Sequence, residues 1–135
     1  MNISYNTSLK TYNTFGIDAM AKVVAEYSSV EELKELLTKY KDAQLLPIDE
    51  GSNLLFTQDF DGIVLRSRMC RAKAVKETDK EVLIEAESGL KLDELIAQVV
   101  DMNLTGLENL SYIPGTVGAS AVQNVGAYGV EAKDV

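Results

Sequence analysis

The feature of this 135-residue chain that most restricts its fold is a glycine-rich stretch, residues 106–129. The stretch contains five of the nine glycines, and its only charged residue is Glu108. Each glycine costs backbone entropy when it becomes ordered, so ordinary helices and strands rarely contain so many. A chain accepts that cost where its backbone turns sharply or passes close to another group. We therefore expect the stretch to form turns that approach a ligand.

Composition and charge narrow the classes of protein to which the chain can belong. It is 46% hydrophobic and 25% charged, which is typical of a soluble globular protein. The net charge of −8 argues against nucleic acid and anionic membrane surfaces as partners. No apolar run is long enough to span a bilayer, and the first residues do not resemble a signal peptide. The cytoplasm is therefore the expected compartment.

The chain has one cysteine, Cys70, and no histidine. An internal disulfide is impossible, and a zinc or copper site is not expected, so we predict no metal. Histidine-based acid–base chemistry and Ser-His or Cys-His nucleophiles are excluded within this chain.

The hydrophobic pattern predicts two α+β subdomains divided near residues 67–70. Polar, turn-rich residues 1–16 are expected to be irregular. Strands are expected at 22–27, 44–48 and 62–66, with a capped helix after Ser28 and Ser29, which suggests a parallel βαβ unit. A hairpin at 72–77 and 81–87 and a helix at about 91–102, ended by a left-handed Asn103, are expected next.

Two loops have the composition of a phosphate-binding turn. The first is Gly51-Ser52-Asn53-Leu54, directly after a strand, where Gly51 permits a positive φ and successive N–H groups form an anion-binding concavity. A plain turn remains the alternative. The second is Pro114 to Ser120; a short helix at 116–123 would point its first N–H groups at a ligand above Gly115. A helix that uses glycine only for packing remains equally open.

The absence of basic residues restricts how a phosphate is held here. No Lys or Arg lies between Leu92 and Ala132, and there is no Walker lysine and no GxGxxG fingerprint. Backbone N–H groups and hydroxyls would bind the phosphate, which suits a permanently bound pyrophosphate better than a triphosphate that is cleaved. Gln123 and Asn124 are candidates for contacting a heteroaromatic edge, and Tyr128 is either a pocket wall or a loop anchor.

Three motifs in order carry a resemblance that covers nearly the whole chain: NTFGI at 13–17, EGSNLLF at 50–56, and GLENL through IPGTVGAS to QNVGAYG at 106–129. Together they closely resemble the UDP-N-acetylenolpyruvoylglucosamine reductase family. The resemblance implies an α+β FAD-binding fold of the vanillyl-alcohol-oxidase (PCMH) type, with FAD between two subdomains. It also implies an enzyme that uses NADPH to reduce UDP-N-acetylglucosamine enolpyruvate to UDP-N-acetylmuramate in peptidoglycan synthesis.

By this resemblance, residues 1–68 are the first FAD-binding subdomain and residues 69–135 the second, incomplete at its C-terminal end, with the substrate-binding domain absent. Members of the family are longer than this chain. The arginine, serine and glutamate that carry out their reaction match no position here. No catalytic residue is therefore expected, and the chain alone is expected to be inactive. One departure is Asp49, which replaces a usual glycine and places a second carboxylate beside Glu50 at the proposed pyrophosphate loop. The cofactor-binding residues implied are Gly51, Ser52, Asn53, Leu54, Pro114, Gly115, Gly118, Ala119, Ser120, Asn124, Gly126 and Ala127.

Three other readings stay open at this point. The chain could be a stand-alone flavin- or nucleotide-binding module without turnover, another FAD-linked oxidoreductase of the same superfamily, or a structural α+β domain whose glycines serve packing. A flavin absorption spectrum separates the structural reading from the others.

Overall fold

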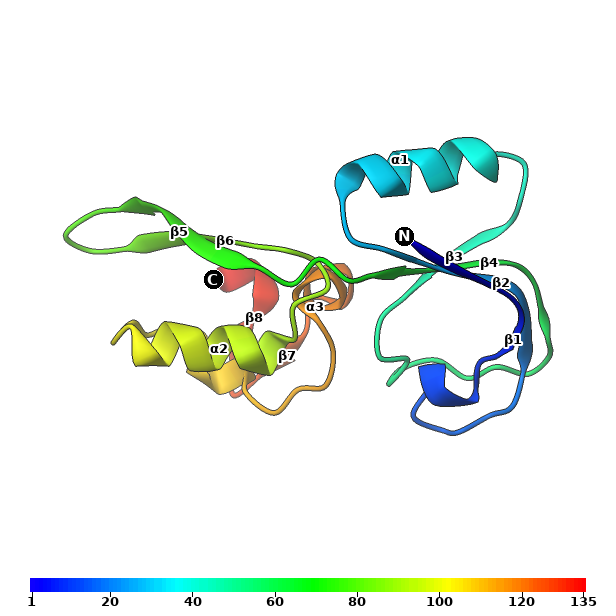
Figure 1. Cartoon of the computed structure of the whole chain (residues 1–135). Helices are drawn as coiled ribbons and strands as arrows, with labels where there is room; N and C mark the ends of the chain where they lie inside the picture. The colour runs from blue at the N-terminus through cyan, green and yellow to red at the C-terminus, as the bar shows by residue number, and fades with distance from the viewer. The chain divides into compact units, whose positions relative to one another are not determined.

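The computed structural model describes residues 1–135, and the chain divides into two compact units, Met1–Met69 and Cys70–Val135. Each unit is an uninterrupted segment that combines strands with helices (Figure 1). The first unit contains a four-stranded sheet, and the second contains a hairpin, two helices and several short elements.

The sheet of the first unit has the strand order β1-β2-β4-β3. β4 is central and parallel to both neighbours, whereas β1 is an antiparallel edge strand on β2. The three strands expected from the sequence are confirmed, and β2 and β3 do run parallel, but β4 lies between them. The strand bounds are Asn2–Ser8 (β1), Met20–Tyr27 (β2), Leu45–Ile48 (β3) and Phe60–Ser67 (β4).

The expectation of an irregular N-terminus is wrong for β1, which pairs with β2 from Asn2 to Ser8. As an edge strand it is only half-buried, so its sequence lacks the continuous apolar run that marks strands 22–27 and 62–66. Pairing with a strongly apolar neighbour, and not local propensity, makes this segment a strand. A short 3-10 turn, η1 (Lys10–Tyr12), follows it.

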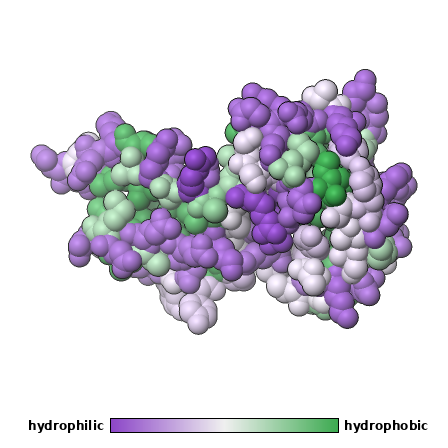
Figure 2. Space-filling view, in the orientation of Figure 1, coloured by the Kyte–Doolittle hydropathy of each residue, from purple (hydrophilic) through white to green (hydrophobic).

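Both faces of this sheet are covered. Helix α1 (Val30–Lys39) lies over one face, where Leu36 packs between Val23 and Ile63 (Figure 1). Ser29 caps the helix by accepting a hydrogen bond from the Glu32 N–H at 3.2 Å, which confirms the expected capping. The outer side of α1 is hydrophilic in Figure 2, in agreement with its run of Glu and Lys residues.

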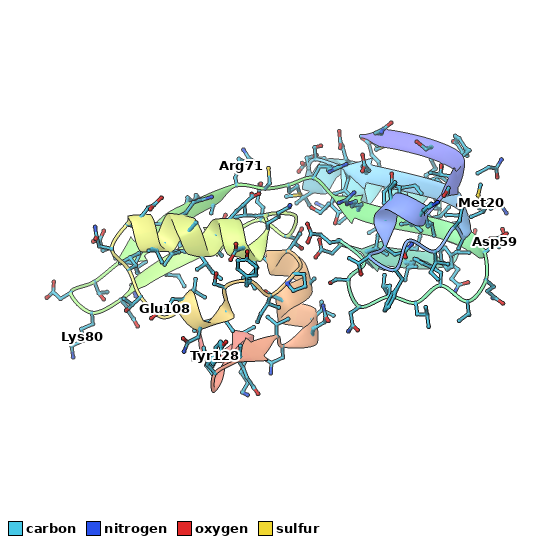
Figure 3. The ribbon with its side chains drawn as sticks, turned by 90° about the horizontal axis from the view of Figure 1, so that it is seen from below. Met20, Asp59, Arg71, Lys80, Glu108 and Tyr128 are labelled. Atoms are coloured by element: carbon cyan, nitrogen blue, oxygen red, sulfur yellow. The ribbon has the colours of Figure 1, made fainter.

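The opposite face is covered by η1 and by the chain between β3 and β4. Val24 and Val64 of the sheet pack there with Leu9, and Leu54 and Phe56 contact this cluster. The start of β2 is held to the same side, because the Met20 N–H donates to Asp59 Oδ1 at 2.8 Å (Figure 3). The chain that links β3 to β4 is therefore held by the apolar contacts of Leu54 and Phe56 and, just before β4, by the hydrogen bond of Asp59.

In the second unit the expected hairpin and both helices are confirmed. Helix α2 buries Leu92, Leu95, Ile96 and Val99, and Asn103 ends it with φ +58°. The bounds are Ala72–Glu77 (β5), Val82–Ala86 (β6), Leu92–Asp101 (α2), Glu108–Leu110 (η2), Val117–Gln123 (α3), Gly126–Ala127 (β7), Val130–Glu131 (β8) and Ala132–Asp134 (η3). None of the helices is long and apolar enough to cross a membrane.

Leu36 and Leu37 provide a matched test of the first unit's core. Leu36 is 1% exposed and Leu37 is 40% exposed on the same helix. We expect Leu36→Ala to lower the free energy of unfolding by about 2–5 kcal/mol, because a cavity replaces packed methyl groups. Leu37→Ala changes helix propensity equally and should cost about 1 kcal/mol or less. Urea denaturation followed by circular dichroism measures both, and equal losses would contradict this assignment of the core.

Candidate cofactor-binding loops

The loop 49–54 begins where β3 ends, at the edge that also holds the carboxyl ends of β2 and β4, because the three strands are parallel. Ligands of open α/β sheets bind outside the carboxyl ends of parallel strands. Gly51 is buried with φ +66°, and a Cβ there would lie 2.1 Å from the Tyr12 carbonyl oxygen. The backbone of this loop therefore passes where only glycine fits.

The segment 12–17 supports the loop, a role that sequence reasoning did not assign to it. The Thr14 N–H donates to the Gly51 carbonyl at 3.3 Å. Asn13 is 6% exposed, and its Nδ2 donates to the carbonyls of Leu9 at 2.7 Å and Ile17 at 3.0 Å. Its Oδ1 accepts from the Ile17 N–H at 3.0 Å. The signal was present in the NTFGI motif, since a buried asparagine that bonds its own backbone is what holds such a turn.

The remaining residues of this loop differ in exposure. Leu54 is half-buried and contacts the apolar cluster of the sheet. Ser52 is half-buried and Asn53 is exposed. The loop is thus anchored by Gly51 and Leu54, while the two polar residues between them lie nearer the surface.

The second loop, Pro114 to Ser120, leads into α3, so the expected short helix is confirmed. The N–H groups of its first turn, however, are used inside the protein. The Val117 N–H donates to the Leu90 carbonyl at 2.8 Å, and the Gly118 N–H donates to the Ser88 carbonyl at 3.0 Å. The expectation that the first N–H groups of this helix point at a ligand is therefore wrong for Val117 and Gly118.

Packing explains the small residues at this helix. A Cβ on Gly118 would lie 2.9 Å from the Ser88 Cβ, so glycine lets α3 approach the β6–α2 loop closely. Ser120 is 8% exposed, and its hydroxyl donates to the Val117 carbonyl at 2.8 Å. Gly115 has φ +128°, and its carbonyl accepts from the Leu92 N–H at 3.0 Å. Pro114 is exposed and Ala119 is half-buried. The packing alternative for this stretch thus accounts for Gly118 and Ser120.

The residues after α3 form a small hairpin, β7–β8, with an open pocket of about 580 Å³. Asn124, Gly126 and Ala127 line this pocket, so the structure brings these three candidates together. Asn124 ends α3 with φ +46°; its Nδ2 donates to Glu131 Oε2 at 2.9 Å and its Oδ1 accepts from the Lys133 N–H at 3.1 Å.

Tyr128 is at the tip of this hairpin (Figure 3). It is 90% exposed with φ +52°, and its role as a pocket wall or as a surface-loop anchor stays a prediction.

Two carboxylates hold the turn that precedes these elements. Glu108 Oε2 accepts from the Gly106 N–H at 2.6 Å. The N–H groups of Glu108 itself and of Gly106 lower the Glu108 pKa. Asp93 of α2 accepts hydrogen bonds from the Ser111 hydroxyl at 2.6 Å and from the Tyr112 N–H at 3.0 Å. Both bonds lower the Asp93 pKa, and the bond from Ser111 has the larger effect. Both carboxylates are therefore ionised at neutral pH; Glu108 closes the turn at 106–108, and Asp93 holds residues 111–112 against α2.

Comparison with known proteins identifies the family to which the chain belongs. The family model described as FAD binding domain matches residues 21–135. The chain is 47% identical over 129 residues to UDP-N-acetylenolpyruvoylglucosamine reductase of Bacteroides fragilis, covering 95% of this chain and 39% of that protein. It is 44% identical over 137 residues to the Pseudomonas aeruginosa reductase, covering 100% of this chain and 40% of that protein.

A solved structure gives the same result. The crystal structure of UDP-N-acetylenolpyruvylglucosamine reductase from Thermus caldophilus matches with a TM-score of 0.73 and 26% identity, over 98% of this chain and 45% of that one. The sequence resemblance and the α+β FAD-binding fold that it implied are thereby confirmed. The chain spans about two fifths of the length of the curated relatives it matches.

Gly51 and Gly16 form a matched pair for testing the loop. Both have a positive φ, +66° and +65°, but nothing lies within 4 Å of a Cβ on Gly16. Gly16→Ala should lower the free energy of unfolding by about 1–2 kcal/mol through backbone strain alone. Gly51→Ala adds the clash with Tyr12, and we expect a loss of about 2–5 kcal/mol. Chemical denaturation of both variants measures the difference; a Gly51→Ala no worse than Gly16→Ala would contradict the close approach.

Proposed function

Because the chain belongs to the FAD binding domain family, we propose that it forms the FAD-binding portion of an NADPH-dependent reductase. The reaction proposed is the reduction of UDP-N-acetylglucosamine enolpyruvate to UDP-N-acetylmuramate, a step of peptidoglycan synthesis in the cytoplasm. The observation that carries this proposal is the 47% identity over 95% of the chain to a relative named as that reductase.

The loops of the chain fit a pyrophosphate-bearing flavin. Gly51 brings a backbone turn to the carboxyl edge of the sheet, where its missing Cβ lets the turn pack against the Tyr12 carbonyl. Ser52 and Asn53 follow it with hydroxyl and amide donors, and consecutive N–H groups of such a turn bind anions. The pocket lined by Asn124, Gly126 and Ala127 has the volume of ordinary ligand pockets.

We assign twelve residues to FAD. Those of the Met1–Met69 unit are proposed at its pyrophosphate, and those of the second unit at the rest of the cofactor. Since the Val117 and Gly118 N–H groups are used internally, the second group is proposed to contact FAD through its other backbone and side-chain atoms. The residues are Gly51, Ser52, Asn53, Leu54, Pro114, Gly115, Gly118, Ala119, Ser120, Asn124, Gly126 and Ala127.

Bound FAD would supply hydride transfer from NADPH to the enolpyruvyl double bond. The chain's own residues hold and orient the cofactor and shield its phosphates from water. No residue of this chain is assigned as the proton donor to the substrate, because the arginine, serine and glutamate that the resemblance implies for this chemistry match no position here. We therefore propose that the 135-residue chain binds flavin without turning over the substrate.

A stand-alone flavin-binding module is the second candidate function. It differs from the first candidate only in the absence of turnover, which the substrate assay below measures. Another FAD-linked oxidoreductase of the same superfamily is disfavoured by the names and identities of these relatives.

Absorbance of the purified chain tests the proposal. We expect a flavin spectrum with bands in the visible region after incubation with FAD and removal of free ligand, because the two loop groups bind the cofactor. With NADPH and UDP-N-acetylglucosamine enolpyruvate, we expect no NADPH oxidation above background, with the full-length Bacteroides fragilis reductase as the positive control. A colourless chain would refute flavin binding, and turnover at the rate of the control would refute the assignment of catalysis to residues outside this chain.

A further inference from the structure

The candidate pyrophosphate loop carries two carboxylates of its own, Asp49 and Glu50, directly before Gly51. Both carboxylates have interaction partners, and a dianionic pyrophosphate at this edge of the sheet is stabilised most by a cation beside it. The cofactor residues proposed above include no Lys or Arg. The structure places one such cation there: Arg66, at the carboxyl end of β4.

Arg66 lies on the face of the sheet that the loop covers. Its register partners are Ile48 on β3, the last residue before the loop, and Glu26 on β2. Val64, two residues earlier, belongs to the cluster that Leu54 contacts, and residues two apart on a strand share a face. Arg66 therefore follows Val64 on the loop side, at the edge where the loop begins.

Tyr12 connects Arg66 to Gly51. The Arg66 guanidinium lies 5.5 Å from the centroid of the Tyr12 ring, within the range of a cation–π contact. The Tyr12 carbonyl is the atom that a Cβ on Gly51 would meet. One residue thus contacts the arginine with its ring and the loop glycine with its backbone, so Arg66 and the loop are held in one arrangement.

The pairing of Arg66 leaves most of its donors for another acceptor. Its closest carboxylate contact is 3.9 Å, to Glu26 Oε1, while Arg68 binds the same oxygen at 2.6 Å. A guanidinium has five N–H donors, and a long contact of this kind occupies few of them. The Arg66 side chain is also the more buried of the two, 24% exposed against 50% for Arg68, so solvent screens its charge less.

We propose that Arg66 is a cofactor-binding residue that donates to the pyrophosphate of FAD. Arg68, which binds Glu26 at 2.6 Å, is not assigned to the cofactor. The inference rests on the proposed function, since it requires FAD at loop 49–54. It differs from that function in naming a side-chain cation where only backbone and hydroxyl donors were expected.

The test compares Arg66→Gln with Arg68→Gln in the 135-residue chain. The dissociation constant for FAD is measured by flavin fluorescence quenching, at about 50 mM and about 500 mM salt. Arg66→Gln should weaken FAD binding roughly ten- to hundredfold, as expected for loss of a charged hydrogen bond, and should flatten the salt dependence. Arg68→Gln should change the FAD affinity less than about threefold. Riboflavin, which lacks the phosphates, should lose no affinity on Arg66→Gln.

The outcomes separate the inference from the proposed function. Suppose first that the wild-type chain binds FAD. If Arg66→Gln then binds FAD equally well, or binds it more weakly but with the wild-type salt dependence, Arg66 is structural. In that case the inference fails and the proposed function stands. If the wild-type chain binds no flavin, the proposed function fails and the inference with it. If circular dichroism shows that Arg66→Gln does not fold, Arg66→Lys is tested in its place. The inference then requires that Arg66→Lys binds FAD more weakly than the wild type but with the same salt dependence. Lysine keeps the positive charge and lacks the paired donors of the guanidinium.

Discussion

The parallel pairing of β4 with β2 on one side and β3 on the other is the constraint on which the first unit depends. It buries Ile63, Val64 and Leu65 between the two covered faces of the sheet. It also brings the carboxyl ends of three strands to one edge. The loop after β3 and the polar end of β4 are neighbours only because of this pairing. An antiparallel β4 would leave the same residues at opposite ends of the sheet.

The sequence predicts most of the regular elements because their apolar periodicity is strong. The helix at Val30–Lys39 and the hairpin at 72–86 are examples, with caps and turn residues that agree with the pattern. The strand at Asn2–Ser8 was not predictable in this way, since its stability comes from hydrogen bonds to β2 and not from its own side chains. Local pattern cannot report a partner that lies eighteen residues away along the chain.

The candidate loops were located from glycine content and motif, but the use of each hydrogen-bond donor was not. Gly51 needs both its positive φ and its missing Cβ, because the Tyr12 carbonyl occupies that space. Gly118 is similar in this respect, since its N–H and its missing side chain serve contact with Ser88. Sequence shows where backbone comes close to something; only the fold shows whether that partner is the protein or a ligand. Arg66 was missed for the converse reason, since it stands outside every motif and reaches the loop only through strand register.

The division of the chain at Met69 and Cys70 also affects how the protein is made. All four strands of the first sheet lie before Cys70, so no later residue is needed to complete it. Translation of the 66 residues from Cys70 to Val135 takes roughly 3 to 13 s at typical rates, which is long compared with the folding of a small unit. The first unit can close its sheet and set Gly51 against Tyr12 while the second is still being synthesised. The order of synthesis thus lets the two halves fold in succession instead of competing for each other's strands.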